Sequence, residues 1–119
     1  MSPDAREKGR LGEDAACELL RSKGFRIVER NWRVRAGEVD VIARRGEVLV
    51  FAEVKSRTGT AFGEPEESVT PAKARRLRAL AAEYLAQAEE RGEVRFDVIA
   101  VMLDSAGVVL EIRHLADAF

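Results

Sequence analysis

Residues 38–55 read EVDVIARRGEVLVFAEVK, an apolar run that is interrupted at its centre by Gly46 and Glu47. Glycine in the first of two central positions is typical of a type II′ turn, which joins neighbouring antiparallel strands. Such a turn pairs Arg45 with Val48 and thereby sets the register of the hairpin. Apolar residues occupy both faces of the strands, with Val39, Val41 and Ala43 on one face and Ile42, Leu49 and Phe51 on the other. We therefore expect a central hairpin that is buried on both sides.

Acidic residues gather at the open end of this hairpin. The register places Asp40 opposite Glu53 and Glu38 opposite Lys55, and Glu53 and Lys55 share a face because they are two residues apart. Three carboxylates here would repel one another and lose hydration, while Lys55 offsets only one charge. A divalent cation would balance the others, and oxygen-only ligands favour Mg²⁺, Mn²⁺ or Ca²⁺ over zinc. Glu-x-Lys triplets are also common on exposed strand edges, but the apolar surroundings favour a buried site here.

Two helices are expected from their capping signals. The first covers about residues 3–23, with Ser2 as its N-cap, Pro3 in its first position and a glycine after its end. The second begins at Thr70 and Pro71, which repeat the same pattern, and ends at residues 91–92, where a cation again precedes a glycine.

Strand patterns fill most of the remaining chain, and they cover residues 25–34, 38–44, 48–56, 94–103 and 107–114. Residues 58–70 lack any period and are expected to form a mobile loop. The resulting order is α-β-β-β-α-β-β. It predicts a single α/β domain over residues 1–119, with one mixed central β-sheet flanked by helices.

Charge is balanced overall but unevenly distributed. The formal net charge of −1 does not by itself indicate a nucleic-acid binder. Basic residues nevertheless predominate in residues 21–35 and 73–78, whereas residues 92–119 are mainly acidic. This pattern is compatible with a locally basic surface and equally with ordinary solvated faces.

The chain has one cysteine, Cys17, so it cannot form an intrachain disulfide. A single cysteine in a helical segment is usually a small core residue, and the one histidine, His114, is far away in the sequence. We find no signal segment and no long apolar span. We therefore expect a cytoplasmic protein with no membrane association.

The order of these motifs resembles that of the PD-(D/E)xK nucleases of the restriction-endonuclease-like fold. An acid on one strand and an acid-x-Lys triplet on the next follow a helix that carries Glu13. The layout is similar to archaeal Holliday-junction resolvases, and still closer to the YraN-type family of small bacterial proteins, which are uncharacterised or predicted nucleases. The matching segments are residues 12–13, 37–40, 51–57, 68–70, 95–98 and 117–119. The chain departs from the superfamily pattern at Val39, where a proline is usual, and at Tyr84, which lacks the glutamine that precedes it in some branches.

The resemblance implies a restriction-endonuclease-like fold and a metal-dependent endonuclease that hydrolyses phosphodiester bonds in DNA, on branched or single-stranded structures. Asp40 and Glu53 would bind Mg²⁺ or Mn²⁺ directly, together with the backbone carbonyl of Val54. Lys55 would orient the attacking water or stabilise the charge of the transition state. Glu13 would hold a second metal ion or a metal-bound water. Glu38 and Asp97 match family positions without an assigned role, and the resemblance also suggests a homodimer.

The start of the second helix is expected close to this site, because the helix follows the loop after the third strand. Basic residues there should contact DNA phosphates, and the predicted set is Arg57, Lys73, Arg75, Arg76 and Arg78. An alternative is a catalytically idle nucleic-acid-binding module of the same fold. A third alternative is an interaction protein with no nucleic-acid role, which only the acidic C-terminal third supports.

Overall fold

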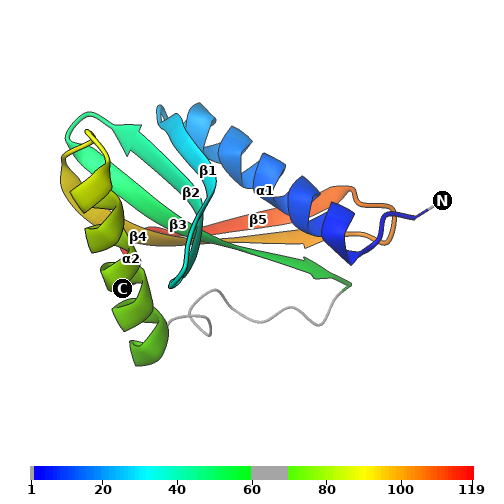
Figure 1. The fold of residues 1–119 in the computed structure, drawn as a ribbon. Coiled ribbons are helices and arrows are strands. Elements are labelled where there is room, and N and C mark those ends of the chain that lie inside the picture. Colours follow the sequence, from blue (N-terminus) through cyan, green and yellow to red (C-terminus); the bar gives the residue numbers. More distant parts are fainter. Residues whose placement is uncertain (1, 60–69) are drawn as a thin grey trace.

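The computed structural model describes residues 2–59 and 70–119. Within these residues a five-stranded sheet, in the order β1-β2-β3-β4-β5, lies between α1 and α2 (Figure 1). Only the β3–β4 pair is parallel, so the sheet is mixed. The elements are α1 Ala5–Ser22, β1 Arg26–Val34, β2 Gly37–Arg45, β3 Val48–Thr58, α2 Pro71–Gln87, β4 Glu93–Leu103 and β5 Val109–Leu115. Their order confirms the predicted α/β, restriction-endonuclease-like arrangement.

The central hairpin has the predicted register. Pairs run from Arg45 with Val48 to Val41 with Ala52, and Gly46 has the positive φ of 57° that the predicted turn requires. Pairing between β2 and β3 stops there, so the direct pairing expected for Asp40 with Glu53 and for Glu38 with Lys55 is absent. The two strands separate at the position of the acidic residues.

A break in strand alternation accompanies this separation. Val39 packs on the α2 side of the sheet, whereas Val41, two residues later, packs on the α1 side. The prediction that both lie on one face is therefore wrong. The neighbouring β1 residue Asn31 has a positive φ of 52°. It lies between the pairs that place Arg30 opposite Val41 and Trp32 opposite Val39. This local twist turns the strands over and leaves Asp40 at the boundary between the two faces.

Each face of the sheet carries its own apolar core. The α1 core contains Ala16, Cys17 and Leu20 of the helix, so Cys17 is a core residue as expected. The α2 core contains the helix residues Leu77, Leu80 and Ala81, together with an edge-to-face contact between Trp32 and Tyr84. Tyr84, which no glutamine precedes at the superfamily spacing, is therefore part of the α2 core.

The helix boundaries differ in part from the predicted ones. The N-cap of α1 is Asp4 and not Ser2, because the Asp4 carboxylate reaches the backbone N–H of Glu7 at 2.9 Å. Thr70 caps α2 as predicted, and its hydroxyl accepts from the Lys73 N–H at 3.2 Å. This helix ends at Gln87, short of the predicted end at residues 91–92.

Gly92 is needed for a close approach and not for capping α2. A Cβ atom on this residue would lie 2.6 Å from the carbonyl oxygen of Glu47. The following residue, Glu93, donates its backbone N–H to that same oxygen. The chain thus enters β4 directly against the hairpin turn, which requires glycine there.

The predicted loop over residues 58–70 lies mostly outside the described residues, which omit 60–69. Its two ends are described, since Thr58 closes β3 and Thr70 caps α2. No helix in the described part of the chain is long and apolar enough to cross a membrane.

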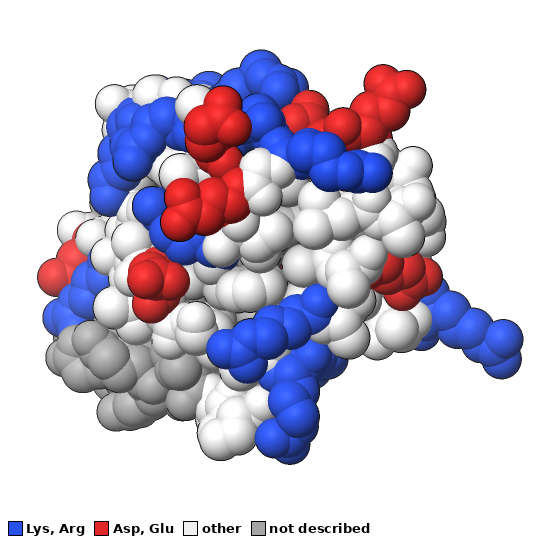
Figure 2. All heavy atoms as spheres, turned by 90° about the vertical axis from the view of Figure 1, so that its left-hand side faces the viewer, with Lys and Arg blue, Asp and Glu red and all other residues white. Residues whose placement is uncertain are grey.

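Surface charge is unevenly distributed, as the sequence indicated. Figure 2 views the molecule from the side on which α2 lies in Figure 1. Lysine and arginine side chains project at the lower centre of this face, whereas acidic and basic side chains are interspersed along its upper part.

Candidate active site

Asp40 lies where β2 and β3 separate. Its Oδ2 accepts a hydrogen bond from the backbone N–H of Val54 at 2.8 Å, so the carboxylate occupies the place of a ladder partner. Because the N–H and C=O groups of one strand residue point the same way, the Val54 carbonyl also faces the β2 side. Burial raises the pKa of Asp40 to about 6, and repulsion from Glu38, Glu13 and Glu53 adds to this rise, although the Val54 hydrogen bond opposes it. The carboxylate would therefore gain from a nearby positive charge.

Glu53 lies on the α2 side of the sheet beside two lysines. Its Oε1 is 3.3 Å from Nζ of Lys73 and 3.7 Å from Nζ of Lys55. Its Oε2 is buried and has no hydrogen-bond partner among the described residues. Glu53, Asp40, Glu38 and Arg76 all border one cavity of about 130 Å³. A buried carboxylate oxygen without a partner is costly, which makes this cavity a candidate cation site.

Lys55 shares a face with Glu53, as predicted, but it does not meet Glu38. Glu38 instead accepts two hydrogen bonds from Arg33, at 2.8 and 3.0 Å. The adjacent Lys73 ammonium and partial burial lower the pKa of Lys55, while Glu53 opposes the change. Glu53 thus attracts the Lys55 ammonium to this position, whereas the Lys73 ammonium repels it.

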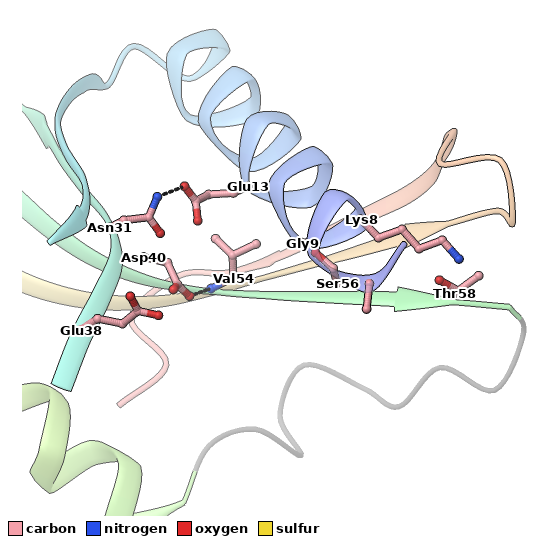
Figure 3. Close-up of a pocket in the computed structure, with 10 residues that line it drawn as sticks. Lys8, Gly9, Glu13, Asn31, Glu38, Asp40, Val54, Ser56 and Thr58 are labelled. Atoms are coloured by element: carbon pink, nitrogen blue, oxygen red, sulfur yellow. Dashed lines mark hydrogen bonds between the residues drawn. The ribbon is translucent and has the colours of Figure 1, made fainter. Parts of the chain in front are cut away.

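Glu13 lies on the opposite, α1 side of the sheet. It accepts from Arg30 at 3.1 and 3.2 Å and from Asn31 at 2.8 Å. Figure 3 shows Glu13, Asn31 and Asp40 directed toward one hollow, with Lys8 and Thr58 at its far end. This hollow has a volume of about 460 Å³. Asp40 lines both this hollow and the Glu53 cavity, so it connects Glu13 with Glu53.

The donor set fits a hard divalent cation. In residues 2–59 and 70–119 no three carboxylate, imidazole or thiol groups come close enough to form a complete metal site. Mg²⁺, however, is commonly held by only one or two carboxylates, with water and substrate phosphate oxygens completing its shell. Asp40 and Glu53 border the same cavity, and Glu53 Oε2 has no partner among the described residues. These two carboxylates match that mode of binding.

The predicted basic residues divide into two groups. Arg75, Arg76 and Arg78 are exposed on α2, and Arg76 reaches the Glu53 cavity. Arg57 is exposed near the end of β3. Lys73 instead contacts Glu53 directly. The basic segment around Lys73 did not predict this contact. Its spacing of four residues from the core residue Leu77 was the local signal that it lies on the sheet side of α2.

Asp97, which had no assigned role, is the centre of a buried polar network. It accepts from Arg95 at 2.9 and 3.0 Å, from His114 Nε2 at 2.7 Å and from the Asp117 N–H at 3.0 Å. Nζ of Lys23 lies 2.7 Å from His114 Nδ1, and because an ammonium can only donate, Nε2 carries the histidine proton. Burial alone would raise the pKa of Asp97, but the hydrogen bonds from His114, Arg95 and Asp117 lower it to about 2. The network ties β5 and the C-terminal residues to β4.

Comparison with known proteins places the chain in a family. The model of "Uncharacterised protein family UPF0102" matches residues 12–101. The chain belongs to the UPF0102 family. This is the YraN-type family that the motifs indicated. The matched segment contains Glu13, Asp40, Glu53 and Lys55.

Relatives of similar length support this assignment. A UPF0102 protein of Moorella thermoacetica is 45% identical over the full length of both chains. One from Dictyoglomus turgidum is 44% identical over 96% of this chain and 98% of its own. One from Rhodococcus opacus is 48% identical over 93% of this chain and 94% of its own. These descriptions name no activity, so the function of this UPF0102 chain must be argued from its site.

Proposed function

We propose that this UPF0102 chain is a Mg²⁺- or Mn²⁺-dependent endonuclease that hydrolyses phosphodiester bonds in DNA, with branched or single-stranded structures as its substrates. One observation carries the proposal. Two half-buried carboxylates, Asp40 and Glu53, border a single cavity in which an oxygen of Glu53 lacks a partner among the described residues, and Lys55 lies beside them. An electrophile and an ammonium at one point are what phosphodiester hydrolysis needs.

Each residue has a distinct task in this proposal. Asp40 and Glu53 would hold the cation, with the Val54 carbonyl as a further ligand, and the bound cation would supply Lewis acidity and lower the pKa of a bound water. Lys55 would stabilise the negative charge that develops on the attacked phosphate. Glu13, which Arg30 and Asn31 hold in place, would orient a water from the α1 side. The exposed arginines of α2, with Arg57 and Lys73, would contact the phosphates of the bound DNA.

The decisive experiment compares Lys55→Ala and Asp40→Ala with wild type. DNA binding and Mn²⁺-dependent cleavage are measured on the same preparations with junction, flap, single-stranded and duplex DNA. Lys55→Ala should lower the cleavage rate by on the order of 10²-fold or more, with little loss of affinity, because its charge matters most in the transition state. Glu18→Ala and Arg21→Ala, an exposed ion pair at the far end of α1, are the controls and should cleave normally.

Two outcomes would contradict the proposal. Cleavage that persists unchanged in both site variants would indicate a different active site or a contaminating nuclease. A wild-type protein that binds DNA but cuts none of the four structures with either metal would favour the idle binding module.

The idle module has one structural observation in its favour. Lys55 and Lys73 already lie beside Oε1 of Glu53, and Oε1 of Glu13 already accepts hydrogen bonds from Arg30 and Asn31. In such a module these residues would be a structural ion-pair network and Lys55 one more phosphate contact. Replacement of Lys55 would lower the DNA affinity of the binding module, whereas in the enzyme it would lower the cleavage rate.

A further inference from the structure

The first turns of α1 carry cations that the site described above does not use. Arg6 and Arg10 are exposed, Lys8 is half-buried, and none of the three has an ion-pair or hydrogen-bond partner in the described part of the chain. Arg6 and Arg10 are four residues apart, so they lie on the same side of the helix. Free arginines at this spacing present their guanidinium groups to a common ligand.

These arginines border a hollow between α1 and β1. The hollow has a volume of about 780 Å³, and its charged lining consists of four arginines and two acids: Arg6, Arg10, Arg30, Arg33, Glu13 and Asp14. Arg30 donates to both acids, at 2.7 Å to Asp14 and 3.1 Å to Glu13. Arg30 balances one of these two carboxylate charges, and the six charged residues of the lining together leave a formal net charge of +2 for a ligand.

The hollow leads directly to the carboxylates. It shares Gly9, Glu13 and Asn31 with the hollow that Asp40 lines, and that hollow shares Glu38 and Asp40 with the Glu53 cavity. Arg76 of α2 lies on the far side of this last cavity. The shared lining residues thus place the arginines of α1 on one side of Asp40 and Arg76 of α2 on the other.

We propose that the α1–β1 hollow is a second phosphate-binding arm, which holds the nucleic-acid backbone on the side of Asp40 opposite α2. The proposal rests on the proposed function, since it concerns the same bound strand. Phosphates are repelled by Glu13, Glu38 and Asp40, so a strand that crosses these acids needs cations on both sides of them. Arginine suits this role because its planar fork binds phosphate oxygens in pairs.

The test measures binding without divalent metal, so that cleavage does not interfere. Arg6→Ala/Arg10→Ala is compared with Arg21→Ala/Arg91→Ala, a control with the same change of net charge at exposed positions away from the hollow. Affinity for single-stranded oligonucleotides of about 4 and about 16 nucleotides is followed by fluorescence anisotropy over a range of salt concentrations.

We expect the Arg6/Arg10 variant to bind the longer oligonucleotide roughly tenfold more weakly at low salt and to lose about 1.4 units of salt slope, because two phosphate contacts of about 0.7 each are removed. Binding of the short oligonucleotide should weaken much less, because the exposed arginines of α2 alone can hold it. The control should match wild type with both lengths.

The outcomes separate this inference from the proposed function. If wild type binds and the Arg75/Arg76 double alanine variant weakens binding while the Arg6/Arg10 variant does not, the second arm is wrong and the nuclease proposal stands. An equal loss of affinity in the Arg21/Arg91 control would also overturn the second arm, because the effect would then depend on net charge alone. If wild type binds no nucleic acid, both proposals fail together.

Discussion

Two lysines lie against one carboxylate in the site, and this crowding has a measurable consequence. Lys73 and Lys55 both lie within 4 Å of Glu53 Oε1, at 3.3 and 3.7 Å. Each ammonium competes with a metal ion for the same negative charge. The presence of Lys73, which has no catalytic task in the proposal, should therefore lower the affinity of the site for a metal ion.

We expect Lys73→Ala to bind Mn²⁺ more tightly than wild type, by roughly three- to tenfold, because a competing charge is removed from a half-buried carboxylate. Titration calorimetry of Mn²⁺ into the DNA-free protein measures this directly. Arg75→Ala, an exposed change on the same helix, is the matched control and should leave Mn²⁺ affinity unchanged. Weaker Mn²⁺ binding by Lys73→Ala would show that Lys73 organises the ligands.

Asp97 predicts how stability depends on pH. Its folded-state pKa of about 2 lies below the ordinary 3.8, so ionised Asp97 stabilises the fold. This contribution is complete above about pH 4 and is lost as the pH falls through about 2. Asp97→Asn should cost about 2–4 kcal/mol at pH 7, since Arg95 and His114 would lose a buried partner.

Urea unfolding of wild type and Asp97→Asn at pH 7 and at pH 2.5 measures this difference. The gap between the two proteins should narrow markedly at the lower pH. A gap of the same size at both pH values would mean that the network contributes through packing and not through the charge of Asp97.

At the level of the helices and strands, α1 owes its position over β3 to Gly12. A Cβ atom at this residue would lie 3.0 Å from Cβ of Ser56 and would collide with its hydroxyl oxygen. Glu13 follows directly, so the close packing of α1 also sets the distance between Glu13 and Asp40. Gly9, one turn earlier, has open space where its Cβ would be.

These two glycines form a matched pair for mutation. Gly12→Ala should destabilise the protein by about 1–3 kcal/mol, because α1 must move away from β3. Gly9→Ala should stabilise it by about 0.5–1 kcal/mol, because alanine favours the helix and meets nothing. Chemical denaturation of both variants tests the opposite signs, and a neutral Gly12→Ala would show that rotation of Ser56 relieves the contact.

For the molecule as a whole, a metal that binds only the folded protein must raise its stability. We expect Mn²⁺ to raise the melting temperature of wild type in a concentration-dependent way. The free energy of unfolding should increase by about 2.7 kcal/mol when the Mn²⁺ concentration is 100 times the dissociation constant. Thermal unfolding monitored by circular dichroism, with and without EDTA, gives the measurement. Asp40→Ala and Glu53→Gln should show no such increase, whereas Glu18→Ala should respond like wild type. A wild type that gains nothing at millimolar Mn²⁺ contradicts the metal site.

Much of the fold could be read from local patterns. The hairpin register follows from a two-residue turn and from alternating apolar residues, both of which act over a few positions. The cap at Thr70 is equally local, since it needs only an N–H three residues further on. The approximate positions of all five strands and the element order were predictable for the same reason. The proximity of Glu53 and Lys55 followed from the two-residue strand period, whereas the predicted register pairing of Asp40 with Glu53 did not form.

The tertiary structure decided what depends on segments that are distant in the sequence. Asp40 lies between the two faces because Asn31 of β1 twists the neighbouring strand, so Glu53 and Glu13 approach it from opposite sides. Lys73 reaches Glu53 only because α2 packs across the sheet. The arginines of α1 border the same hollow as Glu13 and Arg30 only because α1 lies against β1. Local turns and periods determine which elements form, but the charges that meet at a site are set by the packing of those elements.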